Sequence, residues 1–234
     1  MLKHSLKISR TASVMKRLSM LWEECAAFYT FFRRTDKNSK NIIFYSSQAQ
    51  YISFLEGLID SLITNHNVKL CYITSDCDDP ILYSKSPDIT TFCFNKLFPF
   101  VLPFVDASAI VMTMPDINQF HVKRSINEKT NHVYVFHSLI STHMGYRRGA
   151  FDYYDTVFCA GPHHRKEVRR NEEVYGLKPK RLLAVGYSRV DKIFAEHKTY
   201  LSQFASIVDQ RRTCVLIAPS WQPLGILETC GREL

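Results

Sequence analysis

The chain has 234 residues, of which 46% are hydrophobic and 22% charged, so it can bury one sizeable core in the manner of an ordinary globular protein. Its net charge of +8 favours an anionic partner, such as a phosphorylated substrate or an acidic membrane surface. Nucleic acid is the least favoured partner, because there is no RNP motif, zinc-finger spacing or long basic run.

The sequence shows no sign of a membrane-spanning helix or of a signal peptide. The most apolar run, residues 97–105, contains two prolines and is far shorter than the roughly 20 residues that a transmembrane helix needs. The basic residues 1–10 are not followed by an apolar segment with a cleavage site, so we expect no signal peptide.

Residues 11–34 are predicted to form one amphipathic helix. Apolar side chains recur there at spacings of three and four, among them Leu18, Trp22 and Cys25, while Lys16, Arg17, Glu23, Glu24 and Arg33 fall on the other face. The apolar face either packs on the protein's own core or lies on an anionic membrane; the flanking basic residues suit the membrane and the two glutamates do not.

After a polar break at residues 35–40, short apolar strands alternate with helical segments. Strands are predicted over 41–46, 68–74, 89–94, 109–114, 133–136, 156–160 and 181–185, and helices over 48–65, 162–175 and 190–208. Strands that are apolar throughout are buried on both faces, so the pattern predicts an α/β fold with a Rossmann-like parallel sheet flanked by helices. In such sheets ligands bind beyond the carboxyl ends of the strands.

The last residues suggest the opening of a second domain. Residues 214–218 (CVLIA) are predicted to form another buried strand, and little sequence follows it. We therefore expect an amphipathic helix over 1–36, a Rossmann-like domain over 37–209 and a truncated start of a further domain over 210–234.

The seven cysteines are odd in number and show no CxxC spacing. Several lie in apolar runs, such as Cys71 and Cys159, so we expect reduced core cysteines in a cytoplasmic protein and no metal site. The sequence also lacks the GxxxxGK[ST], GxGxxG, HExxH and GxSxG motifs, so we expect no cofactor.

Three strand ends carry residues that are suited to chemistry. The first is the segment from His137 to His143. His137 directly follows the strand 133–136, and an imidazole at that edge can accept a proton from an attacking hydroxyl, since its ordinary pKa is near 6.5. Ser138, Ser141, Thr142 and His143 are candidates for binding phosphate oxygens, although a structural histidine that caps a loop is the alternative.

The second strand end is CAGPHH at residues 159–164. Gly161 followed by Pro162 predicts a helix N-terminus, where backbone N–H groups attract anions, and His163 could add to such a site. Basic residues at helical spacing follow, namely Arg165, Lys166, Arg169 and Arg170; they either strengthen an anion site or form a solvated face.

The third strand end is GYSRVD at residues 186–191. Gly186 ends a strand, Asp191 opens a helix, and the guanidinium of Arg189 is a fixed fork of donors that suits a phosphate. The alternative is an Arg189–Asp191 pair that only shapes the loop. The acidic pair Asp152 and Asp155 is expected to be structural.

These motifs, FHS at 136–138, FDYYD at 151–155, CAGPHH at 159–164 and GYSRVD at 186–191, stand in an order that resembles the CDP-glycerol glycerophosphotransferases of teichoic-acid-type polymer synthesis. The segment Pro219-Ser220-Trp221 resembles the first strand of that family's second domain. The resemblance covers residues 130–221, and the preceding residues match only as a generic α/β half.

The resemblance implies a GT-B fold with two Rossmann-like domains, of which this chain is the N-terminal, acceptor-side half. It implies transfer of glycerol phosphate from CDP-glycerol to a hydroxyl of a polyol-phosphate or glycan acceptor at the cytoplasmic face of the cell membrane, with His137 as the base. The family's donor contacts lie mainly in the second domain, so we expect this chain to be incomplete and to turn over little by itself.

Two departures from the family pattern leave the substrate open. The family often has Trp-His-Gly where this chain has Phe136-His137-Ser138, and often has proline where this chain has Ser188. A GT-B glycosyltransferase that uses a nucleotide sugar, and a non-catalytic module that binds a membrane peripherally, are therefore kept as alternatives.

Overall fold

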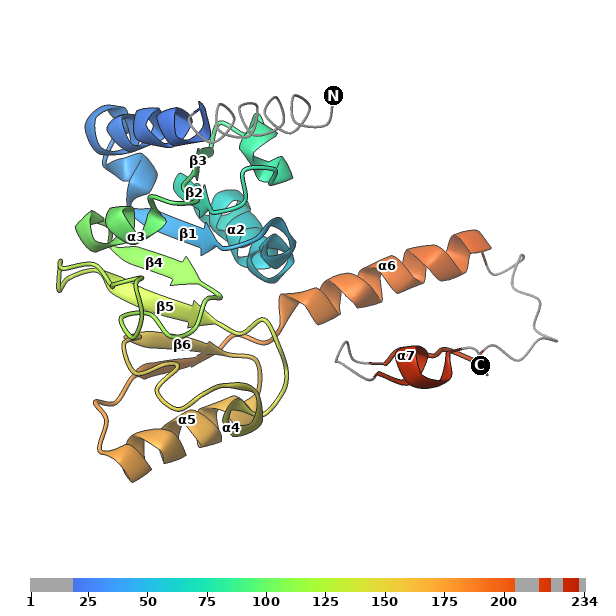
Figure 1. Cartoon of the computed structure of the whole chain (residues 1–234). Helices are drawn as coiled ribbons and strands as arrows, with labels where there is room; N and C mark the ends of the chain where they lie inside the picture. The colour runs from blue at the N-terminus through green and yellow to red at the C-terminus, as the bar shows by residue number, and fades with distance from the viewer. Residues whose placement is uncertain (1–18, 205–214, 220–224, 232–234) are drawn as a thin grey trace, which may run out of the picture. The chain divides into compact units, whose positions relative to one another are not determined.

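A computed structural model describes residues 19–204, 215–219 and 225–231, which fall into two units, one within Met1–Asp191 and one within Lys192–Leu234. The first unit is built on a seven-stranded sheet in the order β3-β2-β1-β4-β5-β6-β7, with every pairing parallel. The strands all point the same way across the sheet (Figure 1). They are β1 (Ile42–Ser46), β2 (Leu70–Thr74), β3 (Ile89–Cys93), β4 (Ala109–Met112), β5 (Asn131–Val135), β6 (Thr156–Cys159) and β7 (Arg181–Ala184).

The expected parallel α/β sheet is confirmed, and each of the seven strands predicted between residues 41 and 185 has its counterpart. No boundary moves by more than two residues, and β5 begins at Asn131 rather than at residue 133. The pairing of Asn131 and His132 with β4 extends the strand, and polar His132 is tolerated in the core because its ring bonds the Ser125 amide at 3.2 Å and faces the Thr130 carbonyl at 3.2 Å.

Two apolar clusters cover the two faces of the sheet, since successive strand residues point to opposite sides. One face buries Phe44, Tyr72, Val111 and Val133 against Leu55 and Ile59 of a helix. The other buries Ile43, Ile73, Ile110 and Tyr134 against aromatic and aliphatic side chains from residues 31, 92–105 and 150–154. The central strands β1, β2 and β4 are therefore almost entirely buried, whereas β7, at the edge of the sheet, is partly exposed.

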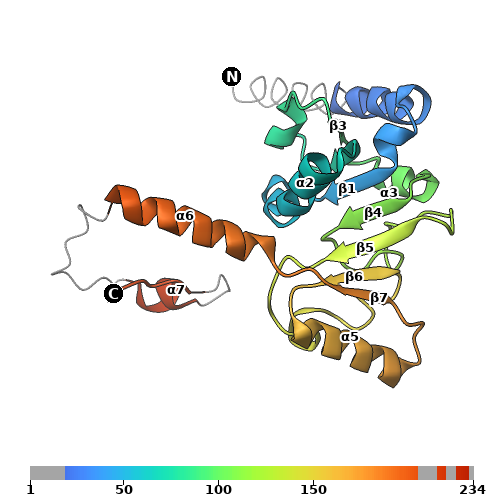
Figure 2. The ribbon, with the colours of Figure 1, turned by 180° about the vertical axis from the view of Figure 1, so that it is seen from behind.

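The larger helices of the first unit lie on both sides of the sheet (Figure 1). Their bounds, with short 3-10 helices as η, are η2 (Asn38–Lys40), η3 (Ala49–Tyr51), α2 (Ile52–His66), η4 (Pro80–Tyr83), α3 (Phe98–Val101), η5 (Leu102–Phe104), α4 (Thr142–Gly145) and α5 (Pro162–Tyr175). The predicted helix at 48–65 is thus η3 continued by α2, and the apolar run 97–105 is α3 and η5. Figure 2, the view from behind, shows α5 alongside β6 and β7.

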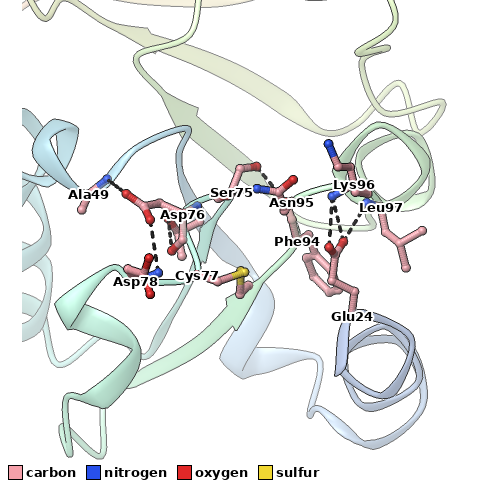
Figure 3. Close-up of a disulfide and its surroundings, with 12 residues drawn as sticks. Glu24, Ala49, Ser75, Asp76, Cys77, Asp78, Phe94, Asn95, Lys96 and Leu97 are labelled. Atoms are coloured by element: carbon pink, nitrogen blue, oxygen red, sulfur yellow. Dashed lines mark hydrogen bonds between the residues drawn. A yellow bond between two sulfur atoms is a disulfide. The ribbon is translucent and has the colours of Figure 1, made fainter. Parts of the chain in front are cut away.

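The predicted N-terminal helix is present where the structure describes it. Residues 19–29 are α-helical and continue into one turn of π-helix, η1 (Thr30–Arg34); residues 11–18 of the prediction lie outside the described residues. Phe31 is buried edge-on against the rings of Phe92 and Phe94, at centroid distances of 5.3 and 6.0 Å. The carboxylate of Glu24, 3% exposed, accepts the amides of Lys96 and Leu97 at 2.9 and 2.8 Å (Figure 3). This helix therefore packs on the core through part of its surface.

A disulfide contradicts the expectation of reduced cysteines. Cys77, in the loop after β2, is bonded to Cys93, the last residue of β3 (Figure 3). The expectation was wrong because it searched for short CxxC spacing, whereas parallel pairing of β2 and β3 brings together residues that are 16 apart in the chain. Cys71 and Cys159 are free and buried as expected, and burial raises the pKa of the Cys159 thiol to about 11.

The second unit contains most of α6 (Ser188–Phe204), an extended segment over 215–219 and α7 (Ile226–Cys230). The predicted helix 190–208 begins two residues earlier, at Ser188, and its residues 205–208 lie outside the described residues. The predicted strand 214–218 is not formed over 215–218, where Val215 and Leu216 are 78% and 89% exposed. An apolar segment becomes a buried strand only beside a partner strand, and none in the described parts pairs with it. None of the helices in the described ranges is both long and apolar enough to span a membrane.

Candidate active site at the carboxyl edge of the sheet

A cavity of about 340 Å³ opens at the carboxyl edge of the sheet, where the strand order reverses. β1 connects to β2 on one side and its other neighbour, β4, connects to β5 on the other, so the crevice between β1 and β4 is the topological switch point at which parallel sheets bind ligands. Residues from three strand ends line the cavity, namely Ser47 after β1, Thr113–Asp116 after β4 and His137 after β5, together with Tyr51, Tyr146 and Arg147.

His137 stands in this cavity as the sequence predicted. It is half-buried, and its Nδ1 atom lies 3.4 Å from the Tyr134 hydroxyl. Burial lowers the pKa of His137 below its ordinary value, while the Thr113 backbone acts in the opposite direction. The imidazole is therefore neutral at pH 7, the state in which a histidine can accept a proton.

Aromatic rings fix the orientation of His137. The rings of Tyr51 and Phe54, from η3 and α2, meet it edge-on at centroid distances of 5.4 and 6.1 Å, and Tyr146 lies at 6.0 Å. Edge-to-face packing of this kind excludes water and restrains the ring. Low polarity around the ring also explains why the pKa of His137 is lowered.

Asp116 is the second polar side chain of the cavity, and its environment is unusual. Its backbone has φ = 63°, in the left-handed region that residues other than glycine rarely adopt. Burial raises the pKa of its carboxyl group, which Arg147 opposes from 3.4 Å. The Oδ1 atom is buried and has no hydrogen-bond partner among the described residues. A strained backbone that holds an unsatisfied buried acceptor is typical of a ligand-binding position.

A second cavity of about 200 Å³ lies farther along the same edge, at the ends of β5, β6 and β7. Gly186 and Arg189 line it, and φ at Gly186 is 75°, which allows the sharp turn after β7. The Arg189 guanidinium donates to Ser53 Oγ at 2.8 Å and lies over the Phe54 ring at 4.9 Å. The Phe54 ring is therefore a neighbour of both His137 and Arg189. Arg189 does not pair with Asp191, which is exposed in the first turn of α6.

Ser141 and Thr142, predicted phosphate ligands, instead bind a carboxylate. Both hydroxyl groups donate to Glu167 of α5, and the Thr142 amide donates to it at 2.5 Å. Burial would raise the pKa of Glu167, but these hydrogen bonds lower it to about 2. A phosphate would be repelled beside this carboxylate. We therefore leave Ser141 and Thr142 out of the candidate site, together with exposed His143, which lies 4.0 Å from Glu167.

The Gly161-Pro162 turn begins α5 as the sequence predicted, with Gly161 as N-cap and Pro162 in the first turn. The two histidines that follow hold a loop. His163 Nε2 lies 3.2 Å from the Leu139 carbonyl and His164 Nε2 lies 3.1 Å from the Ile140 carbonyl. Ser138 also belongs to this loop, because its Oγ accepts the Ile140 amide at 3.3 Å. These contacts secure the chain that follows His137.

The basic residues of α5 are also largely used within the fold. Arg169 pairs with Glu172 and donates to the Lys180 carbonyl, and Arg170 pairs with Glu173 at 3.1 Å. Asp155, expected to be structural, accepts the His132 amide and pairs with Arg124 at 3.0 Å. In the part of the chain that the structure describes, no three His, Cys, Asp or Glu residues are grouped so that they could hold a metal ion.

A family model described as CDP-glycerol:poly(glycerophosphate) glycerophosphotransferase matches residues 27–227, most of the chain. The chain belongs to this family. A search of curated proteins finds no match. A solved structure of the wall teichoic acid polymerase TagF is similar, with 12% identity and a TM-score of 0.48, over 88% of this chain and 53% of that chain. A variant of the same polymerase has 10% identity and a TM-score of 0.47, over 86% and 53%.

This member of the glycerophosphotransferase family thus spans about half the length of the polymerase structures that it matches. The matched region, residues 27–227, includes both cavities of the carboxyl edge. Residues of the two cavities therefore belong to the part of the chain on which the family assignment rests.

Sequence reasoning missed several residues of the candidate site. Asp116 could have been found, because it follows the strand 109–112 at the same edge as His137. Arg147, Tyr51 and Phe54 carried no motif; Arg147 belongs to the segment after α4, and the two aromatic residues resemble the core-facing side of a helix. Only the arrangement of η3 and α2 beside the end of β5 brings those rings to His137.

Proposed function

We propose that this chain activates the acceptor hydroxyl in the transfer of glycerol phosphate from CDP-glycerol to a polyol-phosphate or glycan acceptor in surface-polymer synthesis. The observation that carries the proposal is neutral His137 in the switch-point cavity of a chain that belongs to the glycerophosphotransferase family. In the proposed chemistry the acceptor oxygen bonds to the phosphorus that carries glycerol. The bond from that phosphorus to the CMP oxygen breaks, CMP leaves with the electron pair, and His137 receives the proton of the hydroxyl.

Asp116 and Arg147 are proposed to bind and orient the acceptor. The free Oδ1 of Asp116 is suited to accept a hydrogen bond from a polyol hydroxyl, which satisfies a buried acceptor. Arg147, whose side chain is 63% exposed and paired with Asp116 at 3.4 Å, can offer its remaining N–H groups to a phosphate. The two side chains together suit a molecule that carries a hydroxyl group and a phosphate, as an acceptor polymer of glycerol phosphate does.

Arg189 is proposed to stabilise negative charge on the phosphate that is transferred. Its guanidinium is oriented by Ser53 and Phe54, the second of which also contacts His137. Phosphoryl transfer depends mainly on positioning and charge stabilisation, so a preorganised arginine near the base is useful. Gly186, in the turn after β7, leaves room beside Arg189 because it has no side chain.

The first test is His137→Ala, and the more conservative His137→Gln, in the 234-residue chain. Transfer of labelled glycerol phosphate and release of CMP are measured, with His121→Ala, which changes an exposed histidine, as the control. Loss of the base should lower the rate by about 10²–10⁴-fold. Equal rates for His137→Ala and the control, both above the rate without protein, would contradict the proposed role of His137.

The pH dependence gives a second test. Because burial lowers the pKa of His137, the base is deprotonated at pH 7 and is lost only as pH falls through a value below 6.5. We expect kcat/KM to be constant near pH 7 and to fall on the acid side. Replacing CDP-glycerol by a nucleotide sugar in the same assay tests the alternative glycosyltransferase. Turnover with the nucleotide sugar and none with CDP-glycerol would favour the glycosyltransferase.

A binding measurement does not depend on turnover. Glycerol 3-phosphate is titrated into the chain while the His137 ring protons are followed by NMR. A phosphate bound beside His137 stabilises the imidazolium and raises its pKa. An unchanged His137 titration, in the presence and absence of the ligand, would place the acceptor elsewhere.

We also propose that the protein is cytoplasmic and associates peripherally with the inner face of the cell membrane. Several large apolar side chains of the N-terminal helix point outward, with Trp22 77% and Tyr29 55% exposed, and Arg33 and Arg34 follow them. Interfacial helices combine an exposed aromatic side with basic residues in this way. Sedimentation with phosphatidylglycerol vesicles should fall for Trp22→Ala and not for Tyr83→Ala, which removes another exposed aromatic residue.

A further inference from the structure

A groove of about 360 Å³ between residues 142–151 and α5 is not used by the proposed reaction. It shares Tyr146 and Arg147 with the His137 cavity, so one segment of chain lines both spaces. The groove is therefore placed to hold a part of the acceptor that continues beyond the hydroxyl at His137.

The groove combines apolar walls with arginine. Phe151 and Val168 line it, and the Arg148 guanidinium lies 4.0 Å from the centroid of the Tyr175 ring. Within the described residues Arg148 pairs with no carboxylate, unlike Arg170, which pairs with Glu173. Stacking on an aromatic ring orients the planar guanidinium and leaves its N–H groups free for a ligand.

Glu167, the carboxylate that lines the described part of the groove, is charged, but three arginines, Arg147, Arg148 and Arg170, line the groove as well. Both oxygens of Glu167 accept hydrogen bonds from Ser141 and Thr142. Arg147 and Arg148 are both exposed, so the groove favours a negatively charged ligand. Aromatic and aliphatic walls suit the carbon chain between the charges of a polyol phosphodiester.

We propose that this groove is a second acceptor subsite, in which Arg148, stacked on Tyr175, binds a phosphate of the acceptor polymer at least one repeat away from the hydroxyl held at His137. The inference rests on the proposed function for the identity of the ligand. With this subsite, the affinity of the protein for an acceptor depends on acceptor length. An acceptor with several phosphates occupies both spaces, whereas a single glycerol phosphate occupies only the His137 cavity.

The test compares acceptors of one phosphate and of several phosphates. Affinities of the 234-residue chain for glycerol 3-phosphate and for a glycerol phosphate oligomer are measured by calorimetry. Arg148→Ala should weaken oligomer binding by about tenfold, the loss expected for one charge-assisted contact, and leave glycerol 3-phosphate unchanged. The control is Arg165→Ala, which removes the same charge from an exposed position of α5 outside the groove.

The outcomes separate this inference from the proposed function. If Arg148→Ala weakens oligomer binding while His137→Ala leaves a measurable transfer rate unchanged, the subsite is supported and the proposed role of His137 is refuted. A second outcome is that transfer depends on His137, while wild type, Arg148→Ala and Arg165→Ala bind the oligomer with equal affinity. This outcome would overturn the subsite and leave the proposed function standing. Binding to phosphatidylglycerol vesicles is measured last. If Arg148→Ala weakens vesicle binding and not oligomer binding, the groove binds a lipid headgroup and the inference is overturned.

Discussion

Removing the disulfide between Cys77 and Cys93 should lower the free energy of unfolding by about 3 kcal/mol. The cross-link closes a loop of 16 residues, and for that length the loss of loop-closure entropy in the unfolded chain amounts to about 3 kcal/mol at 25 °C. The native contacts of β2 and β3 do not depend on the bond, because the two strands are joined by their own pairing from Leu70 to Thr74. We therefore expect Cys77→Ala to fold and to be less stable.

The assay is urea unfolding of wild type and Cys77→Ala, each with and without reductant, since the free energy of unfolding falls linearly with urea. The stability difference should be present under oxidising conditions and disappear when wild type is reduced. Cys25→Ala, which changes an exposed free cysteine, is the control. Equal stability of oxidised wild type and Cys77→Ala, or a difference that survives reduction, would refute the entropic reasoning.

The same variant has a local readout near the candidate site. Asp76, next to Cys77, accepts the Ala49 amide at 3.1 Å at the start of η3 (Figure 3). η3 and α2 carry Tyr51 and Phe54, the rings that contact His137. If the disulfide restrains this loop, hydrogen exchange of the Ala49 amide will be faster in Cys77→Ala than in wild type.

Three further variants test other contacts. In Gly57→Ala the new Cβ would lie 2.7 Å from Ser188 Cβ, so we expect a loss of about 1 to 3 kcal/mol in urea unfolding, relieved by adding Ser188→Gly. Glu24→Gln replaces one buried acceptor oxygen and should cost about 2 kcal/mol, whereas exposed Glu23→Gln should cost nothing measurable. Asp155→Asn should destabilise at pH 7. Burial would raise the pKa of Asp155, but hydrogen bonds from His132 and Arg124 lower it to about 2. The stability from this group is therefore complete above its unfolded pKa near 3.8 and lost as pH falls through about 2. The difference between Asp155→Asn and wild type should vanish over that range.

The sheet could be predicted from sequence because its central strands are buried on both faces. Segments such as Ile42–Ser46 and Leu70–Thr74 are apolar or small throughout, and helices separate most of them. The strand predicted at 214–218 shows the limit of this reasoning. Its residues have the same composition, yet a strand also needs a neighbour, and composition does not say whether one is present.

The candidate site was predictable only in part, because it too depends on contacts between residues that are far apart in the sequence. The position of His137 at the carboxyl edge was predictable, because topology alone places a residue that follows a parallel strand there. The hydrogen bonds of Ser141 and Thr142 to Glu167 were not predicted, because Glu167 lies 25 or more residues away on α5. Asp116 gains its significance from backbone strain and an unsatisfied oxygen, neither of which a residue type reveals.

The contacts of Glu24 and Phe31 have a consequence for any attachment through the N-terminal helix. A flexible tether would let the domain tumble above a surface, whereas this helix is joined to residues 92–97 by a buried carboxylate and a cluster of rings. If the helix lies on a bilayer as proposed, the sheet takes a fixed tilt and height relative to the lipid. If the chain also binds a membrane-attached acceptor as proposed, that acceptor would have to reach this fixed height, and the dimensions of the domain would set the shortest acceptor that can reach His137.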